Sequence, residues 1–263
     1  MMPKTASCRY CSSAALKVLL VLDEPFAIYK CNSCSLVQTL PEAKVIYNEN
    51  STYLETYLAN EELFKSFFRP FVQFAHQCKP AGKMLDIGCS TGFIMDEALK
   101  LGYDTEGLEL NKKAVEYCLS RGLKVYNEFL ADCAFPDNTF DIVTMSHVLE
   151  HIPDLSDFLQ ELHRVVKKTG FLVLSQPLYD SLIAKVLKHK WYGWVPKEHI
   201  WHFTPGTISM FLEENGFKVV KMERNSMYYP LGFNAKTLAT GLLARLAAKM
   251  GLGDQFYVAA QKQ

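Results

Sequence analysis

The sequence predicts an α/β protein whose main domain is a doubly wound, seven-stranded sheet, with a small cysteine-rich module before it. Three observations lead to this fold class. From residue 83 onward, short apolar runs typical of strands alternate with segments typical of amphipathic helices. The first of these runs ends in an acidic residue and a glycine turn, as in sheets that bind ligands beyond the carboxyl ends of their strands. Ahead of residue 41, four cysteines lie in two Cys-x-x-Cys pairs.

The expected elements follow one another along the chain in a regular order. Strand-like runs occupy residues 83–87, 104–110, 123–127, 140–146, 170–175, 217–223 and 255–261, and helices are expected at about 93–101, 112–121, 154–168 and 205–215. Thr204 and Pro205 suit the start of the last of these helices. Residues 41–80 carry aromatic side chains at near-helical spacing, which predicts helices that cap the pocket, with Pro70 interrupting or starting one of them.

Three separate segments end their strands with polar residues. These are the turn from Asp86 to Cys89, the acid Glu109, and the pair Ser146 and His147. Because ligands of open α/β sheets sit beyond the carboxyl ends of the strands, the three segments are expected to meet at one site.

The glycine turn, residues 84–93 (MLDIGCSTGF), indicates a small cofactor that carries adenosine. The two glycines allow backbone N–H groups to approach a ligand, and an acid about 20 residues downstream suits ribose hydroxyls. A pyrophosphate fits less well, because the turn is one glycine short of G-x-G-x-x-G and Asp86 repels an anion. Residues 88–92 also read G-x-S-x-G, so a hydrolase with Ser90 as nucleophile stays open, although no oxyanion segment of the His-Gly-Gly type precedes it.

The N-terminal cysteines are spaced as in a zinc ribbon. Cys8 and Cys11 form one pair, Cys31 and Cys34 the other, and short strands are expected at residues 16–22 and 26–30 between them. Two such pairs can close a tetrahedral sulfur site around zinc, which leaves no open position and so predicts a structural metal. Redox-active or merely buried cysteines are the alternative.

Composition narrows the class of function. The 263 residues carry 28 Lys plus Arg and 28 Asp plus Glu, and a net charge of zero makes nucleic acid an improbable partner. No signal peptide or membrane-spanning run is visible, and eight cysteines without a secretion signal predict reduced thiols in the cytoplasm.

Residues 85–92, Glu109 and residues 140–154 together resemble the signature segments of class I S-adenosylmethionine-dependent methyltransferases, over roughly residues 50–262. The resemblance implies a Rossmann-like, mostly parallel sheet whose last strand is antiparallel. It also implies that the donor's charged amino group faces Asp86, that its ribose is bound by Glu109, and that the loop after residue 127 borders its adenine. The cofactor-binding residues so expected are Asp86, Gly88, Cys89, Ser90, Gly92, Glu109, Leu110, Leu130, Asp132 and Ser146.

Candidate catalytic residues come from two segments. The resemblance places His147 near the reacting methyl group. Glu198 and His199 match a Glu-His pair that removes a substrate proton in similar sugar C-methyltransferases with an N-terminal zinc module, but Pro196 stands where those enzymes have a tyrosine. Two alternatives remain open: His199 and His202 hold a loop against the sheet, or no base is used, because positioning can largely drive this displacement.

The sequence therefore predicts a zinc-ribbon-like module over residues 1–40, a helical cap over 41–80 and an S-adenosylmethionine-binding domain over 81–263. The expected reaction is methyl transfer to a small molecule, most plausibly a saccharide or related metabolite. Alternatives are an RNA methyltransferase that grips RNA with its zinc ribbon, and a cofactor-binding protein without catalysis. Basic and apolar side chains over residues 178–194 and 233–250 suit a lid or core helix, or contact with a membrane surface or lipid-linked substrate. The sequence does not determine the oligomeric state.

Overall fold

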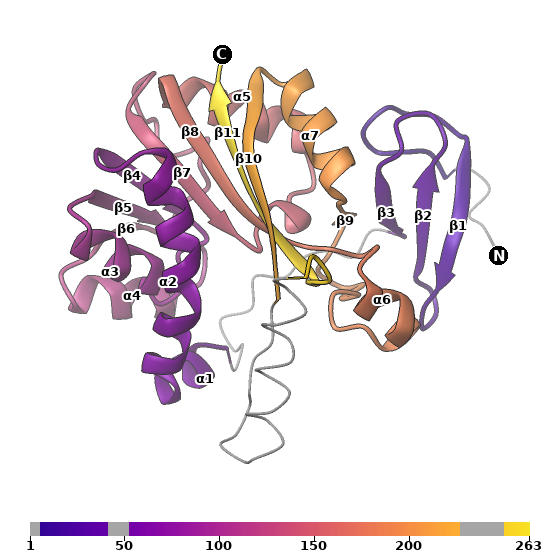
Figure 1. The fold of residues 1–263 in the computed structure, drawn as a ribbon, viewed down its shortest axis with the longest axis horizontal. Coiled ribbons are helices and arrows are strands. Elements are labelled where there is room, and N and C mark those ends of the chain that lie inside the picture. The colour runs from indigo at the N-terminus through magenta and orange to yellow at the C-terminus, as the bar shows by residue number, and fades with distance from the viewer. Residues whose placement is uncertain (1–5, 42–52, 227–249) are drawn as a thin grey trace.

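The computed structural model describes residues 6–41, 53–226 and 250–263, and contains the seven-stranded sheet that the alternating pattern predicts (Figure 1). The strand order is β10-β11-β8-β7-β4-β5-β6. Strands β8, β7, β4, β5 and β6 run parallel, and β11 is antiparallel to both β8 and β10, as expected. The strands are β4 (Lys83–Ile87), β5 (Asp104–Leu108), β6 (Lys124–Tyr126), β7 (Phe140–Ser146), β8 (Val166–Pro177), β10 (Phe217–Asn225) and β11 (Gln255–Lys262).

Helices cover both faces of this sheet, so the doubly wound arrangement is confirmed. Adjacent strand residues point to opposite faces: Met84 of β4 belongs to a buried cluster that includes residues of α2 and α3, whereas Leu85 belongs to one that includes residues of α5 and α7. The helical elements are α1 (Tyr53–Ala59), α2 (Glu61–Cys78), α3 (Phe93–Lys100), α4 (Lys112–Ser120), η1 (Leu149–His151), α5 (Leu155–Val165), α6 (Leu182–Leu187), η2 (Lys188–Lys190) and α7 (Pro205–Glu214). The helix expected at 154–168 ends earlier, because the chain enters β8 at Val166. The helix expected at 233–250 falls almost wholly outside the described residues.

Helix α2 passes through Pro70 without ending there, so the prediction of an interrupted or newly started helix was wrong. A proline inside a helix costs about 3 kcal/mol, because it removes one backbone hydrogen bond and crowds the preceding turn. Phe71 and Phe74 on the next turn are both fully buried against the sheet. Burial of two such rings contributes about 3–6 kcal/mol, which offsets the local cost.

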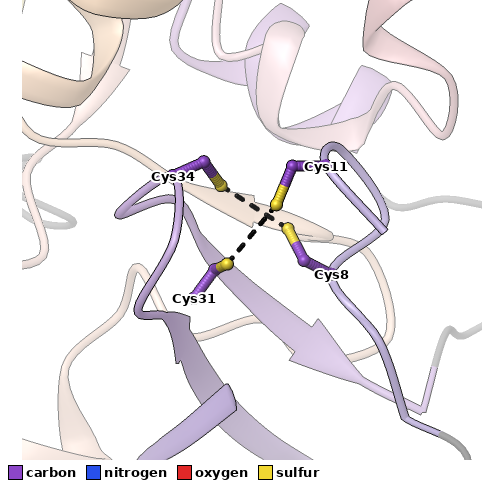
Figure 2. Close-up of side chains that lie close together, drawn as sticks. All are labelled: Cys8, Cys11, Cys31 and Cys34. Carbon is purple, nitrogen blue, oxygen red and sulfur yellow. Dashed lines mark hydrogen bonds between the residues drawn. The ribbon is translucent and has the colours of Figure 1, made fainter. Parts of the chain in front are cut away.

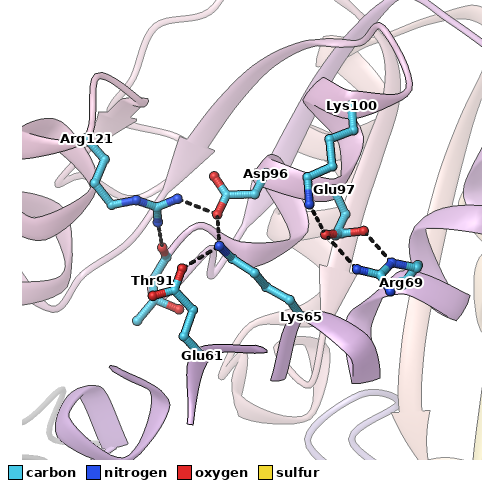
Figure 3. A network of polar contacts seen from close by, with 8 residues as sticks. All are labelled: Glu61, Lys65, Arg69, Thr91, Asp96, Glu97, Lys100 and Arg121. Carbon is cyan, nitrogen blue, oxygen red and sulfur yellow. Dashed lines mark hydrogen bonds and ion pairs between the residues drawn. The ribbon is translucent and has the colours of Figure 1, made fainter. Parts of the chain in front are cut away.

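A network of charges fixes α2 against α3, the helix that follows the glycine turn (Figure 3). The Nζ of Lys65 lies 3.4 Å from an Oδ of Asp96, and the Nε of Arg69 lies 2.8 Å from an Oε of Glu97. Arg121 pairs with Asp96 and donates a 2.9 Å hydrogen bond to the carbonyl oxygen of Thr91 in the turn itself. The turn is therefore held by side chains from α2, α3 and the end of α4.

The N-terminal residues form a second, four-stranded antiparallel sheet of order β1-β2-β3-β9. Strands β1 (Leu16–Val21) and β2 (Ala27–Cys31) confirm the two strands expected between the cysteine pairs. Strand β3 (Val37–Leu40) was not predicted, and neither was its partner β9 (Trp201–His202), which comes from the segment before α7. The cysteine-rich module is thus joined by backbone hydrogen bonds to a segment some 160 residues away in the chain.

Within the described ranges, no helix is both long and apolar enough to cross a bilayer.

Candidate cofactor and acceptor site

A cavity of about 340 Å³ lies at the carboxyl ends of β4, β5 and β7, where the three polar segments were expected to meet. It is lined by residues from α1, from the glycine turn, from the ends of β5 and β7, and from the segment before β9. Its described lining comprises Leu54, Tyr57, Ile87, Gly88, Ser90, Leu108, Glu109, Leu110, Asn111, Ala114, Glu128, Phe129, Leu130, His147, Val148, His151, Ile152, Phe158 and Glu198. A smaller cavity of about 70 Å³ shares Tyr57, Gly88, Ser90 and His147 with it and adds Cys89 and Ser146.

Gly88 forms the tight exit from β4. Its φ of +72° lies in the left-handed region, and its N–H donates a 2.8 Å hydrogen bond to the carbonyl oxygen of Leu108. A Cβ at this position would lie 2.5 Å from Cγ2 of Val148. The glycine is therefore required both by the backbone conformation and by the close approach of the neighbouring strand end.

Glu109 is fixed at the rim of the cavity by two backbone donors. The N–H of Ser90 lies 2.8 Å from Oε2, and the N–H of Asn111 lies 2.7 Å from Oε1. A carboxylate offers about four lone-pair positions, so each oxygen can still accept a further hydrogen bond. The arrangement presents a rigid, bidentate acceptor to a ligand with two neighbouring hydroxyls.

Asp86 lies beneath the turn and is not among the described residues that line either cavity. Its side chain is 1% exposed, and Oδ1 accepts a 2.7 Å hydrogen bond from the hydroxyl of Thr144, while Oδ2 has no hydrogen-bond partner in the described part of the chain. Burial is the main reason that the pKa of this carboxyl rises to about 7, and the nearby charge of Glu109 adds to it. Asp86 is thus a buried acid whose ionisation a neighbouring cation would favour.

The other expected cofactor residues divide between the cavity wall and its surroundings. Leu110 and Leu130 line the large cavity, and Cys89 and Ser146 line the small one. Gly92 starts α3 with φ +76°, and a Cβ there would lie 2.4 Å from the side chain of Leu123. Close packing around the start of this helix therefore requires a glycine at position 92. Asp132 is exposed and absent from the described lining, where Glu128 and Phe129 of the same loop appear instead.

Ser90 has a φ of +47°, a strained backbone that a nucleophile elbow also adopts. An elbow serine needs a histidine that accepts its proton. No hydrogen bond from a histidine to the Ser90 hydroxyl occurs among the described residues, so the structure gives the hydrolase alternative no catalytic partner. The N–H of Ser90 binds Glu109 instead.

His147 occupies the wall shared by the two cavities, with a left-handed backbone of φ +56°. Its Nε2 lies 3.1 Å from Oε1 of Gln255, and its Nδ1 lies 3.3 Å from Oε1 of the buried Glu150. Burial lowers the pKa of this imidazole, but the carboxylate of Glu150 outweighs that effect and leaves the pKa raised. With an oxygen facing each ring nitrogen, the geometry suits a charged imidazolium, which has no lone pair left to accept a proton.

The segment carrying Glu198 and His199 is held from two sides. On the cavity side, Nδ1 of His151 donates a 3.0 Å hydrogen bond to the carbonyl oxygen of Glu198, whose side chain lines the cavity. On the other side, Thr39 of β3 donates to the carbonyl oxygen of His199 at 2.7 Å and accepts from Nε2 of His202 at 2.8 Å. His199 itself lies behind the described cavity lining, and burial lowers its pKa to about 4.

Glu150 and His151 lie outside the helix that the sequence predicts at 154–168. They form a separate 3-10 turn, η1, whereas α5 begins after Asp154, whose Oδ1 accepts the N–H of Asp157 at 3.1 Å. His151 therefore joins the cavity wall, together with the adjacent Val148 and Ile152. Their position directly after the predicted strand end was the signal that could have found them.

The four N-terminal cysteines converge, as their spacing predicts (Figure 2). The Sγ atoms of Cys8 and Cys34 are 3.6 Å apart, those of Cys11 and Cys31 are 3.5 Å apart, and all four lie within 4.8 Å of one another. Sulfurs bound to one zinc at about 2.3 Å in tetrahedral geometry are roughly 3.8 Å apart. The four side chains thus already have almost the spacing that the metal requires.

Comparison with known proteins agrees with this fold. Residues 59–222 match the sequence profile of a family described as "Methyltransferase domain". Among solved structures, an S-adenosylmethionine-dependent methyltransferase from Archaeoglobus fulgidus superimposes with a TM-score of 0.58 at 22% identity, covering 79% of this chain and 99% of its own. A similar enzyme from Thermotoga maritima gives a TM-score of 0.59 at 18% identity, covering 80% and 96%.

Curated relatives share less of their length. A ubiquinone biosynthesis O-methyltransferase from Colwellia psychrerythraea is 26% identical over 151 residues, which is 52% of this chain and 61% of that protein. A protein of the same name from Methylococcus capsulatus is 28% identical over 58% of this chain and 70% of its own, and the mitochondrial one from Schizosaccharomyces pombe is 28% identical over 70% of each.

The Rossmann-like sheet with an acid-flanked glycine turn defines a class of enzymes that bind an adenosine-bearing cofactor at the strand ends. Within that class, the chain belongs to the methyltransferase-domain family.

Proposed function

We propose that this enzyme transfers the methyl group of S-adenosylmethionine to a hydroxyl oxygen of a small molecule bound in the 340 Å³ cavity. The observation that carries the proposal is the placement of Glu109. Its carboxylate is fixed by two backbone donors at the cavity rim, and the same cavity is lined by His147, His151 and Glu198. The cavity thus offers a carboxylate that suits a ribose, together with further polar groups for an acceptor.

The residues present fit the donor. Glu109 would accept the two ribose hydroxyls, and the apolar side chains of Leu110 and Leu130 would flank the adenine. Asp86, buried with one unpartnered oxygen, suits the donor's cationic amino group, directly or through water. The bound donor supplies an activated methyl group on a sulfonium. The protein's part is to hold it in line with the acceptor and to exclude water.

The acceptor is proposed to be a hydroxyl-bearing small molecule because the relatives are named O-methyltransferases. Those names concern ubiquinone biosynthesis and give the expected saccharide no support. Of the three residues expected to be catalytic, Glu198 and His147 line the cavity and are proposed to orient the acceptor. His199 is proposed to support Glu198 from behind.

The donor assignment is tested by calorimetric titration with S-adenosylhomocysteine. We expect micromolar affinity, about −8 kcal/mol, that Glu109→Ala abolishes. The matched control is Glu116→Ala, which removes an exposed glutamate of α4 outside the described lining. Equal affinity in the Glu109 variant and the control would overturn the placement of the ribose. Methylation assays with panels of phenols, alcohols and sugars would then identify the acceptor class.

We also propose that Cys8, Cys11, Cys31 and Cys34 bind one structural zinc ion, as in a zinc ribbon. Metal analysis should give one zinc per chain, and Cys8→Ser should lose it, whereas Cys78→Ser, a cysteine outside the cluster, should keep it. Because β3 follows the second cysteine pair and joins β9, we expect zinc removal to loosen the segment that carries Glu198. A zinc-free protein with unchanged stability and activity would contradict a structural role.

A further inference from the structure

A second group of metal-ligating side chains lies beside the cavity, apart from the cysteines. Glu150 and His151 of η1 and His199 of the segment before β9 place one potential ligand atom each within 4.8 Å of the others. The rings of His151 and His199 are nearly perpendicular, with centroids 4.7 Å apart. Two imidazoles and one carboxylate, brought together from distant parts of the chain, form a common ligand set for a divalent transition metal.

In both histidines, a hydrogen bond to a backbone carbonyl fixes which ring nitrogen keeps a free lone pair. Nδ1 of His151 lies 3.0 Å from the carbonyl oxygen of Glu198, and Nδ1 of His199 lies 2.9 Å from that of Gly193. A carbonyl oxygen only accepts, so in each ring Nδ1 carries the hydrogen and Nε2 carries the lone pair. A hydrogen bond from one ring nitrogen to a backbone carbonyl is the usual support of a histidine that binds a metal through the other nitrogen.

Glu150 supplies an independent indication that a cation belongs here. Its side chain is 1% exposed, and neither carboxylate oxygen has a hydrogen-bond partner within the described part of the chain. Its ion pair with Nδ1 of His147 is long, at 3.3 Å. A buried carboxylate is costly unless charges or hydrogen bonds compensate it, and one histidine on one oxygen compensates it only in part.

The geometry points to a binding site for one divalent first-row transition metal ion, held by a carboxylate oxygen of Glu150 and the Nε2 atoms of His151 and His199. This inference rests on the proposed function, because it assigns the metal to the polar groups proposed for the acceptor in the same cavity, whose wall includes His151. Two imidazoles favour iron, cobalt, manganese or zinc over magnesium and calcium, which prefer all-oxygen shells.

Three protein ligands leave coordination positions for the acceptor. A metal held there would lower the pKa of a bound acceptor hydroxyl, whose proton would pass to water. The resulting oxygen would be able to attack the methyl carbon of the donor as the carbon–sulfur bond breaks, giving the methyl ether and S-adenosylhomocysteine. Activation of the hydroxyl by the metal requires no separate histidine base, in keeping with His147 having oxygens at both ring nitrogens.

The test is a titration with Mn²⁺ of protein that carries one zinc ion per chain, monitored by the loss of the electron paramagnetic resonance signal of free Mn²⁺. Zinc stays on the thiolates, because Mn²⁺ prefers nitrogen and oxygen ligands. We expect one Mn²⁺ per chain, and an at least tenfold weaker affinity in Glu150→Gln and in His199→Gln. His189→Gln is the matched control, because His189 is an exposed histidine of η2 outside the cluster.

Titration of the same samples with S-adenosylhomocysteine separates the two proposals. Normal binding of S-adenosylhomocysteine without binding of Mn²⁺, or equal Mn²⁺ affinity in Glu150→Gln and wild type, would overturn the metal site while leaving the donor site standing. Loss of S-adenosylhomocysteine binding in wild type would instead refute the proposed function. If the variants fail to fold, the absorption spectrum of wild-type protein that carries one zinc ion per chain, recorded after addition of Co²⁺, decides whether the metal site exists. Cobalt bands without thiolate charge transfer support the site, and their absence refutes it.

Discussion

Substitution of Gly88 by alanine tests whether the turn after β4 is shaped by both backbone conformation and contact with Val148. The left-handed φ of +72° costs an alanine about 1–2 kcal/mol. The added Cβ lies 2.5 Å from Cγ2 of Val148, about 1 Å inside a normal carbon–carbon contact, and overpacking of this kind costs about 1–3 kcal/mol. We therefore expect Gly88→Ala to lower the free energy of unfolding by about 2–5 kcal/mol.

The two contributions are separable by urea unfolding of matched variants. Gly102→Ala has the same kind of backbone, φ +87°, with no atom within 4 Å of the added Cβ, so it measures the conformational cost alone. In the double variant Gly88→Ala/Val148→Ala, the clash with Val148 is removed. The double-mutant cycle should therefore give a coupling energy of about 1–3 kcal/mol between the two positions. Since both residues line the cavity, S-adenosylhomocysteine should bind Gly88→Ala about tenfold more weakly, or about 1.4 kcal/mol. Equal destabilisation by Gly88→Ala and Gly102→Ala would refute the steric argument.

Two further predictions concern buried polar groups. Thr39→Val leaves the carbonyl oxygen of His199 and Nε2 of His202 without this hydroxyl, at a cost of about 1–3 kcal/mol each. Chemical denaturation should therefore show a loss of about 2–6 kcal/mol in unfolding free energy, which Thr39→Ser largely avoids. A loss below about 0.5 kcal/mol would contradict the link between β3 and this segment. The carboxyl of Asp86 has a pKa of about 7 in the folded protein and about 3.8 when unfolded, so the folded protein binds one extra proton between these values. Stability therefore falls as the pH rises from about 4 to 7. The loss is at most about 4 kcal/mol, at about 1.36 kcal/mol per pKa unit. Unfolding measured between pH 5 and 8 should lose this slope in Asp86→Asn, and an unchanged slope would assign the titration to other groups.

The metal and donor proposals make η1 and the segment before β9 the region where experiments are most informative. The backbone N–H of Ile200 donates to the carbonyl oxygen of Glu150 at 2.8 Å, and Nε1 of Trp201 donates to that of Ile152 at 2.8 Å. These bonds tie the segment before β9 to η1. Together with the pairing of β3 and β9, they connect the N-terminal sheet to the residues that line the cavity.

The sequence by itself determined the main sheet and the meeting of the segments that form the proposed donor site. Alternating apolar runs have a period set by the backbone, and both the glycine turn and Glu109 lie directly beside their strands in the chain. Because parallel strands place their carboxyl ends at one edge, the convergence of Gly88, Glu109 and His147 followed from topology alone. The clustering of the four cysteines was equally local, since each pair forms its own turn.

Only the tertiary structure decided which side chains complete the wall of the cavity beside the donor segments. The pairing of β3 with β9 joins residues 37–38 to 201–202, and two strand residues are too short a run to carry a period of their own. The continuity of α2 through Pro70 depends on burial of the neighbouring phenylalanines, which outweighs local propensity. The meeting of Glu150 and His151 with His199 likewise depends on contacts between segments about 50 residues apart. Such contacts depend on the packed fold, because no local pattern in either segment specifies its distant partner.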